Sequence, residues 1–337
     1  MKSLALRLPA TYQRVKKDEL SWLSSYSSVK LPRTWTDRWT FADLLKFKIQ
    51  VRESIHRQER GYLGESHVPE IELPTIGGLR FNYDYQRVHF NLLNPLPLRD
   101  LYHLRGTKIL FQRAFLVQSC QVALTQLLEA ARRVYGSLEV WHPFEAYHES
   151  LRFLDSFGWE SSALRPKAGH ILFIDSSTMT DAQLVPDLRI TKGTKFGIFD
   201  TTCLPVGSSQ IDRVVKLFRA LQVPLILIRS CLKLDGLGME FGRFGHVILL
   251  AEDPSKSMLQ LVKTYRDIAP YFGNNVSSRQ IYPFLQDKDF LALNAAWAKR
   301  VQAANRTLVE HLLSRPEAER WEERVRAFSH GLFSWVD

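Results

Sequence analysis

Short apolar runs, each bounded by polar or turn-forming residues, recur through the middle of the chain. Uninterrupted runs of this length are typical of strands that are buried on both faces of a sheet. We therefore predict buried strands in LEVW from residue 138, ILFID from 171, FGIFD from 196, PLILIR from 224 and HVILLA from 246. A further apolar run, KILFQRAFLVQ from residue 108, precedes them.

Segments with apolar residues at helical spacing alternate with these strands. In SCQVALTQLLEAARRVYG, apolar residues recur every three or four positions up to Tyr135, and Gly136 offers a C-terminal stop. In SSQIDRVVKLFRALQ, Ser209 and Asp212 are placed for a capping box. Buried strands alternating with amphipathic helices predict an α/β fold with a mainly parallel central sheet flanked by helices.

The two ends of the chain have a different texture. Residues 1 to about 80 mix aromatic and charged residues without a clean period, whereas DKDFLALNAAWAKRVQAANRTLVEHLLSRP predicts a long helix that ends near Pro316. A short helical tail, PEAERWEERVRAF, is predicted after it. We divide the chain into an N-terminal extension and arm (1–95), a large domain (96–270) and a helical C-terminal segment (271–337).

Composition narrows the class of protein. The chain has 337 residues, of which 45% are hydrophobic, and it contains only 17 Gly and 15 Pro, as expected of an ordered globular protein. Its net charge of +10 is spread over the chain without a block of like charges, which favours a solvated basic surface over nucleic-acid binding.

Cysteine usage and the N-terminus bear on location. The three cysteines, Cys120, Cys203 and Cys231, are scattered, which fits neither a disulfide framework nor a metal cluster. The N-terminus lacks the apolar core of a signal peptide, and no apolar run is long enough to span a membrane. We therefore expect a cytoplasmic protein with no membrane association and no bound metal.

Polar residues lie at the ends of the predicted strands. Asp175, Asp200 and Ser230 each end an apolar run, and the carboxyl ends of the strands in open α/β sheets form ligand sites. Shortly after Ser230 comes Lys233, in the pattern Ser-x-x-Lys. This pattern suits an acyl-transfer nucleophile with its base, a lysine that carries a cofactor aldehyde as a Schiff base, or an ordinary loop lysine. The S-x-N and K-T-G elements that accompany the acyl-transfer chemistry are missing from plausible places, which weighs against it.

Several segments between about residue 83 and residue 315 resemble the fold type I enzymes of the cystathionine lyase and methionine gamma-lyase group, which use pyridoxal 5'-phosphate. These segments are FLVQSCQVALTQLLEAA, HPFEAYHES, FGIFDTTCLP and IRSCLK. The resemblance implies a phosphate cradle at Ser119, Cys120 and Gln121, a stacking ring at Tyr147, a pyridinium partner at Asp200 with Thr202 beside it, a phosphate ligand at Ser230 and the Schiff-base lysine at Lys233. A helix N-terminus suits a phosphate because its N–H groups are free and its dipole is positive there.

An earlier segment extends the resemblance to a second subunit. In NYDYQRVHFNLLNP, Tyr85 and Arg87 resemble a Tyr-x-Arg segment that reaches into the neighbouring subunit's site and binds the phosphate. Arg87 would supply a charged, bidentate contact. The resemblance therefore implies a homodimer or homotetramer.

The chain also departs from the pattern of this group. Met179 stands where an asparagine would bond the cofactor phenolate, and Leu232 replaces a phosphate-binding threonine. The chain is short at the position of the C-terminal domain that would bind the substrate carboxylate. Arg243 is a conceivable substitute for that contact, and an acidic protein partner would suit the basic charge.

We expect a lyase or transferase that acts on an amino acid by elimination or replacement at the β or γ carbon. In this hypothesis Lys233, Tyr147 and Asp200 are catalytic. One alternative is an aminotransferase, because residue chemistry alone does not separate these reactions. Another is a catalytically reduced binding or scaffold subunit, which Met179, Leu232 and the short C-terminus favour.

Overall fold

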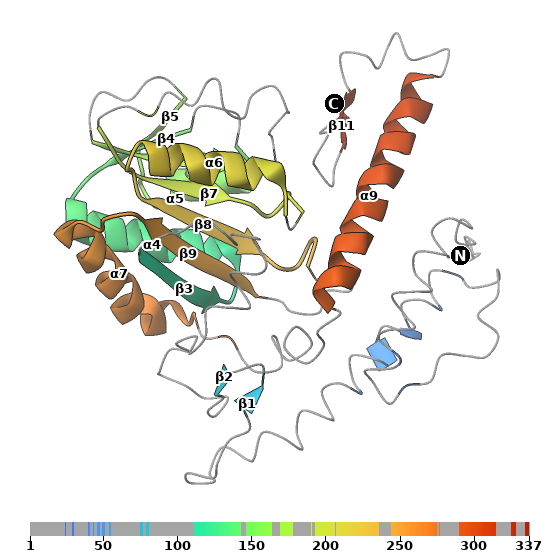
Figure 1. Ribbon diagram of the computed structural model, residues 1–337, viewed down its shortest axis with the longest axis horizontal. Coiled ribbons are helices and arrows are strands. Elements are labelled where there is room, and N and C mark those ends of the chain that lie inside the picture. The colour runs from blue at the N-terminus through green and yellow to red at the C-terminus, as the bar shows by residue number, and fades with distance from the viewer. Residues whose placement is uncertain are drawn as a thin grey trace.

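The computed structural model is shown in Figure 1. It describes residues 111–142, 146–163, 169–177, 193–205, 207–235, 244–274 and 290–314, positions 190 and 276, and a few isolated positions and short strands nearer the two ends. Of the sites discussed above, Tyr85, Arg87, Met179 and Arg243 lie outside the described residues.

A seven-stranded mixed sheet forms the centre of the described part. Its order is β3-β9-β8-β7-β6-β4-β5, and β9 runs antiparallel to both of its neighbours while the other pairs are parallel. The strands are β3 (Phe111–Val117), β4 (Glu139–Trp141), β5 (Ser161–Ser162), β6 (His170–Asp175), β7 (Thr194–Asp200), β8 (Leu225–Ser230) and β9 (Gly245–Ala251). The predicted mainly parallel α/β sheet is confirmed.

Helices cover both faces of this sheet (Figure 1). One hydrophobic cluster joins the sheet to α4 and α7, and a second joins the opposite face to α6. The helices are α4 (Cys120–Tyr135), α5 (His148–Ser156), α6 (Ser209–Ala220), α7 (Lys256–Ile268), the 3-10 turn η1 (Ala269–Phe272) and α9 (Phe290–Leu313).

Strand β6 shows why the apolar runs are uninterrupted. Ile171 and Phe173 belong to the cluster under α4 and α7, whereas Leu172 and Ile174 belong to the cluster under α6. Successive side chains of a strand point to opposite faces, so a sheet covered on both faces needs apolar residues at every position. Burying each such side chain contributes about 1.5–3 kcal/mol.

The ends of α4 follow the sequence signals. Ser119 caps the helix by accepting a hydrogen bond at Oγ from Val122 N at 3.2 Å. Gly136 ends it with a φ of 78°, a left-handed conformation that glycine adopts without steric cost. The predicted stop of this helix at Gly136 is confirmed.

The start of α6 differs from the prediction by one residue. Its cap is Ser208, whose Oγ accepts from Gln210 N at 3.3 Å, and Ser209 is the first helical residue. The backbone of Ser208 has a ψ of 126°, which is the non-helical geometry that a capping residue needs. Asp212 still lies in the first turn, where a carboxylate is favoured by the helix dipole.

The predicted helical tail is wrong where it can be checked. Residues Val325–Ala327 form β10, which pairs antiparallel with β11 (Ser334–Val336). In the register of this pair, Val325 lies opposite Val336 and Arg326 opposite Trp335. A second hairpin joins β1 (Thr75–Ile76) to β2 (Leu79–Arg80).

Among the described residues, no helix combines the length and the apolar character needed to cross a membrane.

One close approach in the core makes a test of the packing. A Cβ at Gly197 of β7 would lie 2.3 Å from Cε1 of Phe218 on α6. We expect Gly197→Ala to lower the free energy of unfolding by about 1–3 kcal/mol, because both groups are fully packed. Urea unfolding of the variant measures this loss.

Phe218→Leu provides the control for that substitution. If the ring is the obstacle, the double variant Gly197→Ala/Phe218→Leu should lose less stability than the sum of the two single variants. Losses that add to within about 0.5 kcal/mol would show that the contact is not the cause.

Candidate functional site

The carboxyl ends of the parallel strands gather the predicted site residues at one edge of the sheet. Asp175 ends β6 and Asp200 ends β7, and the two are partners in the strand register. Ser230 ends β8 and pairs with Gly245, which also pairs with Val117 at the end of β3. The loops that follow these strands therefore start side by side.

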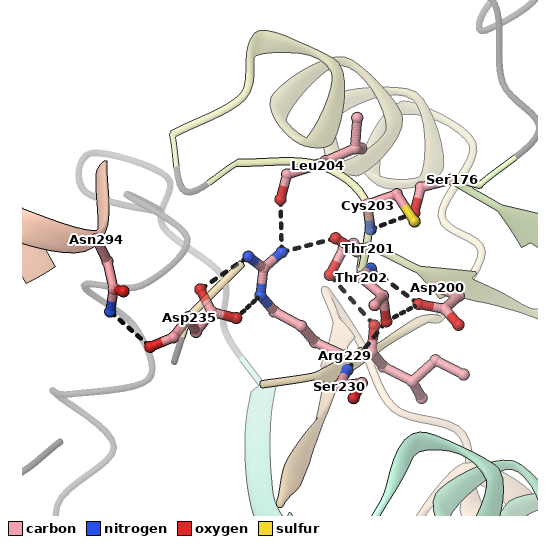
Figure 2. A network of polar contacts seen from close by, with 11 residues as sticks. Ser176, Asp200, Thr201, Thr202, Cys203, Leu204, Arg229, Ser230, Asp235 and Asn294 are labelled. Atoms are coloured by element: carbon pink, nitrogen blue, oxygen red, sulfur yellow. Dashed lines mark hydrogen bonds and ion pairs between the residues drawn. The ribbon is translucent and has the colours of Figure 1, made fainter. Parts of the chain in front are cut away.

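Asp200 is held by the loop that follows it, as Figure 2 shows for Thr202, and by Cys120 of α4. Its Oδ1 accepts hydrogen bonds from Thr202 N at 2.9 Å and from Thr202 Oγ1 at 2.5 Å. Its Oδ2 accepts from the thiol of Cys120 at 3.3 Å. The first two contacts make a turn at the strand end, and the third reaches the first residue of α4.

Thr202 also connects Asp200 to the lysine loop. Its Oγ1 accepts a hydrogen bond from Ser230 N at 3.0 Å while it donates to Asp200. Thr202 is buried, so water does not compete for either bond. The predicted cofactor-binding role of Thr202 stays a prediction.

Asp175 is a second carboxylate beside Asp200. It is 5% exposed, and it accepts hydrogen bonds from Tyr147 N at Oδ2 (2.9 Å) and from Ser177 N at Oδ1 (2.8 Å). Burial, and then the charge of Asp200, raise the pKa of Asp175 to about 6. Two neighbouring carboxylates that are shielded from water ionise together only at a cost, so Asp175 keeps its proton more readily than an exposed aspartate does.

Tyr147 and Lys233 lie together in the structure. The Lys233 Nζ is 5.0 Å from the centroid of the Tyr147 ring, within the range of a cation–π contact. Tyr147 precedes α5 as its N-terminal flanking residue, and its backbone N–H is fixed by Asp175. Burial, and then the charge of Glu149, raise the pKa of the Tyr147 hydroxyl, which favours its neutral form.

The start of α4 borders the same edge. A Cβ at Gly245 would lie 2.5 Å from Arg229 O and 3.4 Å from Cys120 N, so only glycine allows β8, β9 and α4 to approach so closely. The Ser119 hydroxyl acts as the helix cap, and the Gln121 side chain donates to Glu149 Oε2 at 2.6 Å. The phosphate role of these residues stays a prediction, and it would fall to the backbone amides of this turn.

The cysteines near the site are not activated. Burial, and then the charge of Asp200, raise the pKa of Cys120 well above its usual value, and burial raises the pKa of Cys203 to about 12. A thiol needs a lowered pKa to act as a nucleophile near neutral pH. Cys120 therefore serves here as a hydrogen-bond donor to Asp200.

Sequence reasoning missed a buried ion pair behind the lysine loop. Arg229 of β8 binds the carboxylate of Asp235 through Nε (2.6 Å) and Nη2 (2.9 Å), and both side chains are almost fully buried. The signal was available, because an arginine inside an apolar strand requires a partner. Leu232 of the same loop is half-buried and brings no hydroxyl to the site.

No family model matches this chain, and no curated protein sequence matches it. Among solved structures, it is similar to an aromatic-amino-acid aminotransferase from Burkholderia pseudomallei that is covalently bound to pyridoxal phosphate, with a TM-score of 0.53 and 14% identity over 78% of this chain and 72% of that one.

Two further structures agree. An aromatic amino acid aminotransferase from Burkholderia cenocepacia has a TM-score of 0.55 and 12% identity, covering 81% of this chain and 73% of that one. A broad-specificity aminotransferase from Leishmania mexicana has a TM-score of 0.53 and 14% identity, covering 94% of this chain and 84% of that one. Identities this low establish the fold alone. The three structural matches confirm the fold type I architecture, while the narrower resemblance to the cystathionine lyase group stays a prediction.

The raised pKa of Asp175 predicts how stability depends on pH. Its folded-state pKa of about 6 lies above the ordinary value of 3.8, so between these pH values the folded protein binds more protons than the unfolded chain. This contribution is fully present below pH 3.8 and is lost as the pH rises through about 6. We expect the wild type to lose up to about 3 kcal/mol relative to Asp175→Asn across this window, measured by urea unfolding.

Asp253→Asn is the matched control, since Asp253 is exposed. Its unfolding free energy should follow that of the wild type at each pH. Asparagine at position 175 accepts one fewer hydrogen bond, which lowers stability by a constant amount at all pH values. Parallel curves for wild type and Asp175→Asn would contradict the assignment.

Proposed function

We propose that this protein is a pyridoxal 5'-phosphate-dependent enzyme that acts on an amino acid through Lys233. The observation that carries the proposal is the placement of the Lys233 amine 5.0 Å from the Tyr147 ring centroid, at the sheet edge where Asp200 ends β7. The fold is that of solved aminotransferases, one of which is covalently bound to pyridoxal phosphate.

The donor set fits this cofactor. The primary amine of Lys233 can bind the aldehyde, and the flat ring of Tyr147 can stack on the cofactor ring. The carboxylate of Asp200 can bind the ring nitrogen, and the N-terminus of α4 can bind the phosphate. Cys120 donates its thiol to one oxygen of Asp200, but a thiol is a weak hydrogen-bond donor. A cationic N–H group would displace it readily, because hydrogen bonds to charged partners are about twice as strong.

The cofactor would supply an aldehyde that captures amines and a ring that withdraws electrons from the substrate. Lys233 would hold it covalently and, once exchanged for the substrate amine, would return as the base that moves the proton at Cα. Asp200 would keep the ring nitrogen protonated. Tyr147 would cover one face of the ring and exclude water from it.

Transamination is the reaction that the structural neighbours favour. The solved structures compared above are aminotransferases of aromatic or broad specificity. Elimination or replacement at the β or γ carbon remains the second candidate, because the segments around Ser119, Tyr147, Asp200 and Lys233 resemble enzymes of that type. Both reactions begin with the same proton transfer at Cα, so the residues above would serve either one.

Cofactor attachment tests the proposal directly. We expect the purified protein to gain a visible absorbance band when pyridoxal phosphate is added, and borohydride reduction to fix the cofactor on the peptide that contains Lys233. Lys233→Ala should abolish both signals, whereas Lys256→Ala, which removes an exposed lysine at the start of α7, should keep them. Attachment at another lysine, or none at all, would refute the assignment and favour a binding or scaffold role.

Substitutions at Asp200 and Tyr147 should change the affinity for the cofactor to different extents. Asp200→Ala removes a charged hydrogen-bond partner and should weaken cofactor binding about 10- to 100-fold. Tyr147→Phe keeps the ring and should change binding little, while Tyr147→Ala should weaken it clearly. Equilibrium dialysis with pyridoxal phosphate measures each constant, and equal effects of Phe and Ala at position 147 would exclude a stacking role.

The reaction type needs its own assay. Holoenzyme mixed with an aromatic amino acid and a keto-acid acceptor should yield a new amino acid if the reaction is transamination. An amino acid with a leaving group at its β or γ carbon should instead release ammonia and a keto acid if it is elimination. Activity that changes with protein concentration would support the predicted contribution of Tyr85 and Arg87 from a second subunit.

A further inference from the structure

Arg229 lies at the centre of a buried polar network behind the lysine loop (Figure 2). It is 1% exposed, and it donates four hydrogen bonds within the described part of the chain. Two go to the carboxylate of Asp235, and two go from Nη1 to the carbonyl oxygens of Thr201 (2.6 Å) and Leu204 (2.7 Å). One guanidinium thus binds the loop after β7 and the loop after β8 at once.

The ion pair closes the loop that carries Lys233. Arg229 is the penultimate residue of β8 and Asp235 lies just beyond Lys233, so the bidentate contact joins the two ends of the segment 230–234. A planar guanidinium on a carboxylate fixes orientation as well as distance. The loop is therefore held at both ends, and the Lys233 amine is directed from it towards Tyr147.

Helix α9 is attached to the same loop. Asn294 of α9 is 2% exposed and donates from Nδ2 to the backbone oxygen of Asp235 at 2.7 Å. This bond joins residues that lie 59 positions apart in the sequence. The position of α9 is thus transmitted to the residue that closes the lysine loop.

Stability alone does not require these charges. A buried ion pair often stabilises a protein no more than apolar side chains of similar volume, since both charges lose their hydration. The strand partner of Arg229 is His246, and burial, followed by the charge of Arg229, lowers the pKa of His246 to about 3. His246 therefore stays neutral, and Asp235 is the charged group that pairs with the guanidinium.

We infer that Arg229 and Asp235 are a positioning pair for Lys233, with Asn294 linking the pair to α9. The pair fixes the direction of the lysine amine so that it meets the cofactor aldehyde over Tyr147. The inference rests on the proposed function for its purpose, but the geometric claim concerns this chain's own residues. A misplacement of about 1 Å can cost two orders of magnitude in rate, so loosening the loop should affect capture more than stability.

The test compares two variants with a structural control. Asp235→Asn breaks the bidentate charge contact, and Arg229→Met/Asp235→Leu removes both charges without leaving one unpaired. Thr194→Val removes a buried hydroxyl that bonds His170 (2.8 Å) where β7 begins, at the end of the strand opposite Asp200. If Asp235→Asn fails to fold, the double variant and Asn294→Ala still decide the question.

Two kinds of measurement on the full chain, cofactor capture and cofactor-free loop mobility, should change in opposite directions if the pair positions the lysine. The rate at which Lys233 captures pyridoxal phosphate should fall about 10- to 100-fold in the ion-pair variants and about 2- to 10-fold in Asn294→Ala. Without any cofactor, hydrogen exchange across 231–235 and acetylation of Lys233 relative to Lys256 should both become faster. Thr194→Val should lower the melting temperature and change neither measurement.

Each outcome decides a separate question. Ion-pair variants that match Thr194→Val in capture, exchange and acetylation would overturn the positioning role and leave a purely structural pair. Wild-type protein that never captures pyridoxal phosphate at Lys233 would overturn the proposed function instead. In that case the cofactor-free exchange and acetylation rates still show whether Arg229 and Asp235 orient the lysine.

Discussion

The parallel register of β6, β7 and β8 is the constraint on which the site depends. It pairs Asp175 with Asp200 and places Asp200 beside Ile228, next to the end of β8. A slip of one residue would turn each of these side chains to the other face of its strand. An aspartate would then enter an apolar cluster at a cost of several kcal/mol. The same burial that stabilises the sheet therefore fixes where its polar ends meet.

Electrostatics at this edge are set by burial more than by the number of charges. Asp175 and Asp200 lie side by side, so their negative charges repel each other. The raised pKa of Asp175 reduces this repulsion because Asp175 keeps its proton more readily. Hydrogen-bond donors also surround both carboxylates, from Tyr147, Ser177, Thr202 and Cys120. Backbone, hydroxyl and thiol donors stabilise these carboxylates without adding a cation. An edge of this kind suits a partner that brings its own positive charge, as a protonated ring nitrogen does.

The sequence predicts the regular parts of the fold well because period and capping act locally. The buried strands, the ends of α4 and the meeting of Asp175, Asp200 and Ser230 all follow from apolar runs and turn residues. Prediction from the sequence fails where contact with a distant segment determines the local structure. Residues 325–327 read as helix but pair with 334–336, and the cap of α6 moves to Ser208 because the backbone turns one residue earlier. The ion pair of Arg229 needs the fold, since only the fold shows which acid reaches a buried arginine.

Three links between loops explain how side chains on loops can be held in place as firmly as side chains on strands. Asp175 fixes the backbone of Tyr147, Thr202 links Asp200 to Ser230, and Arg229 joins the two loops to Asp235. Each link joins segments that follow different strands, and Asp175, Thr202, Arg229 and Asp235 are buried. No loop has to be rigid alone, because each is held by its neighbour. A departure at one position, such as the thiol of Cys120 on Asp200, is then tolerated, since the carboxylate keeps its orientation from Thr202.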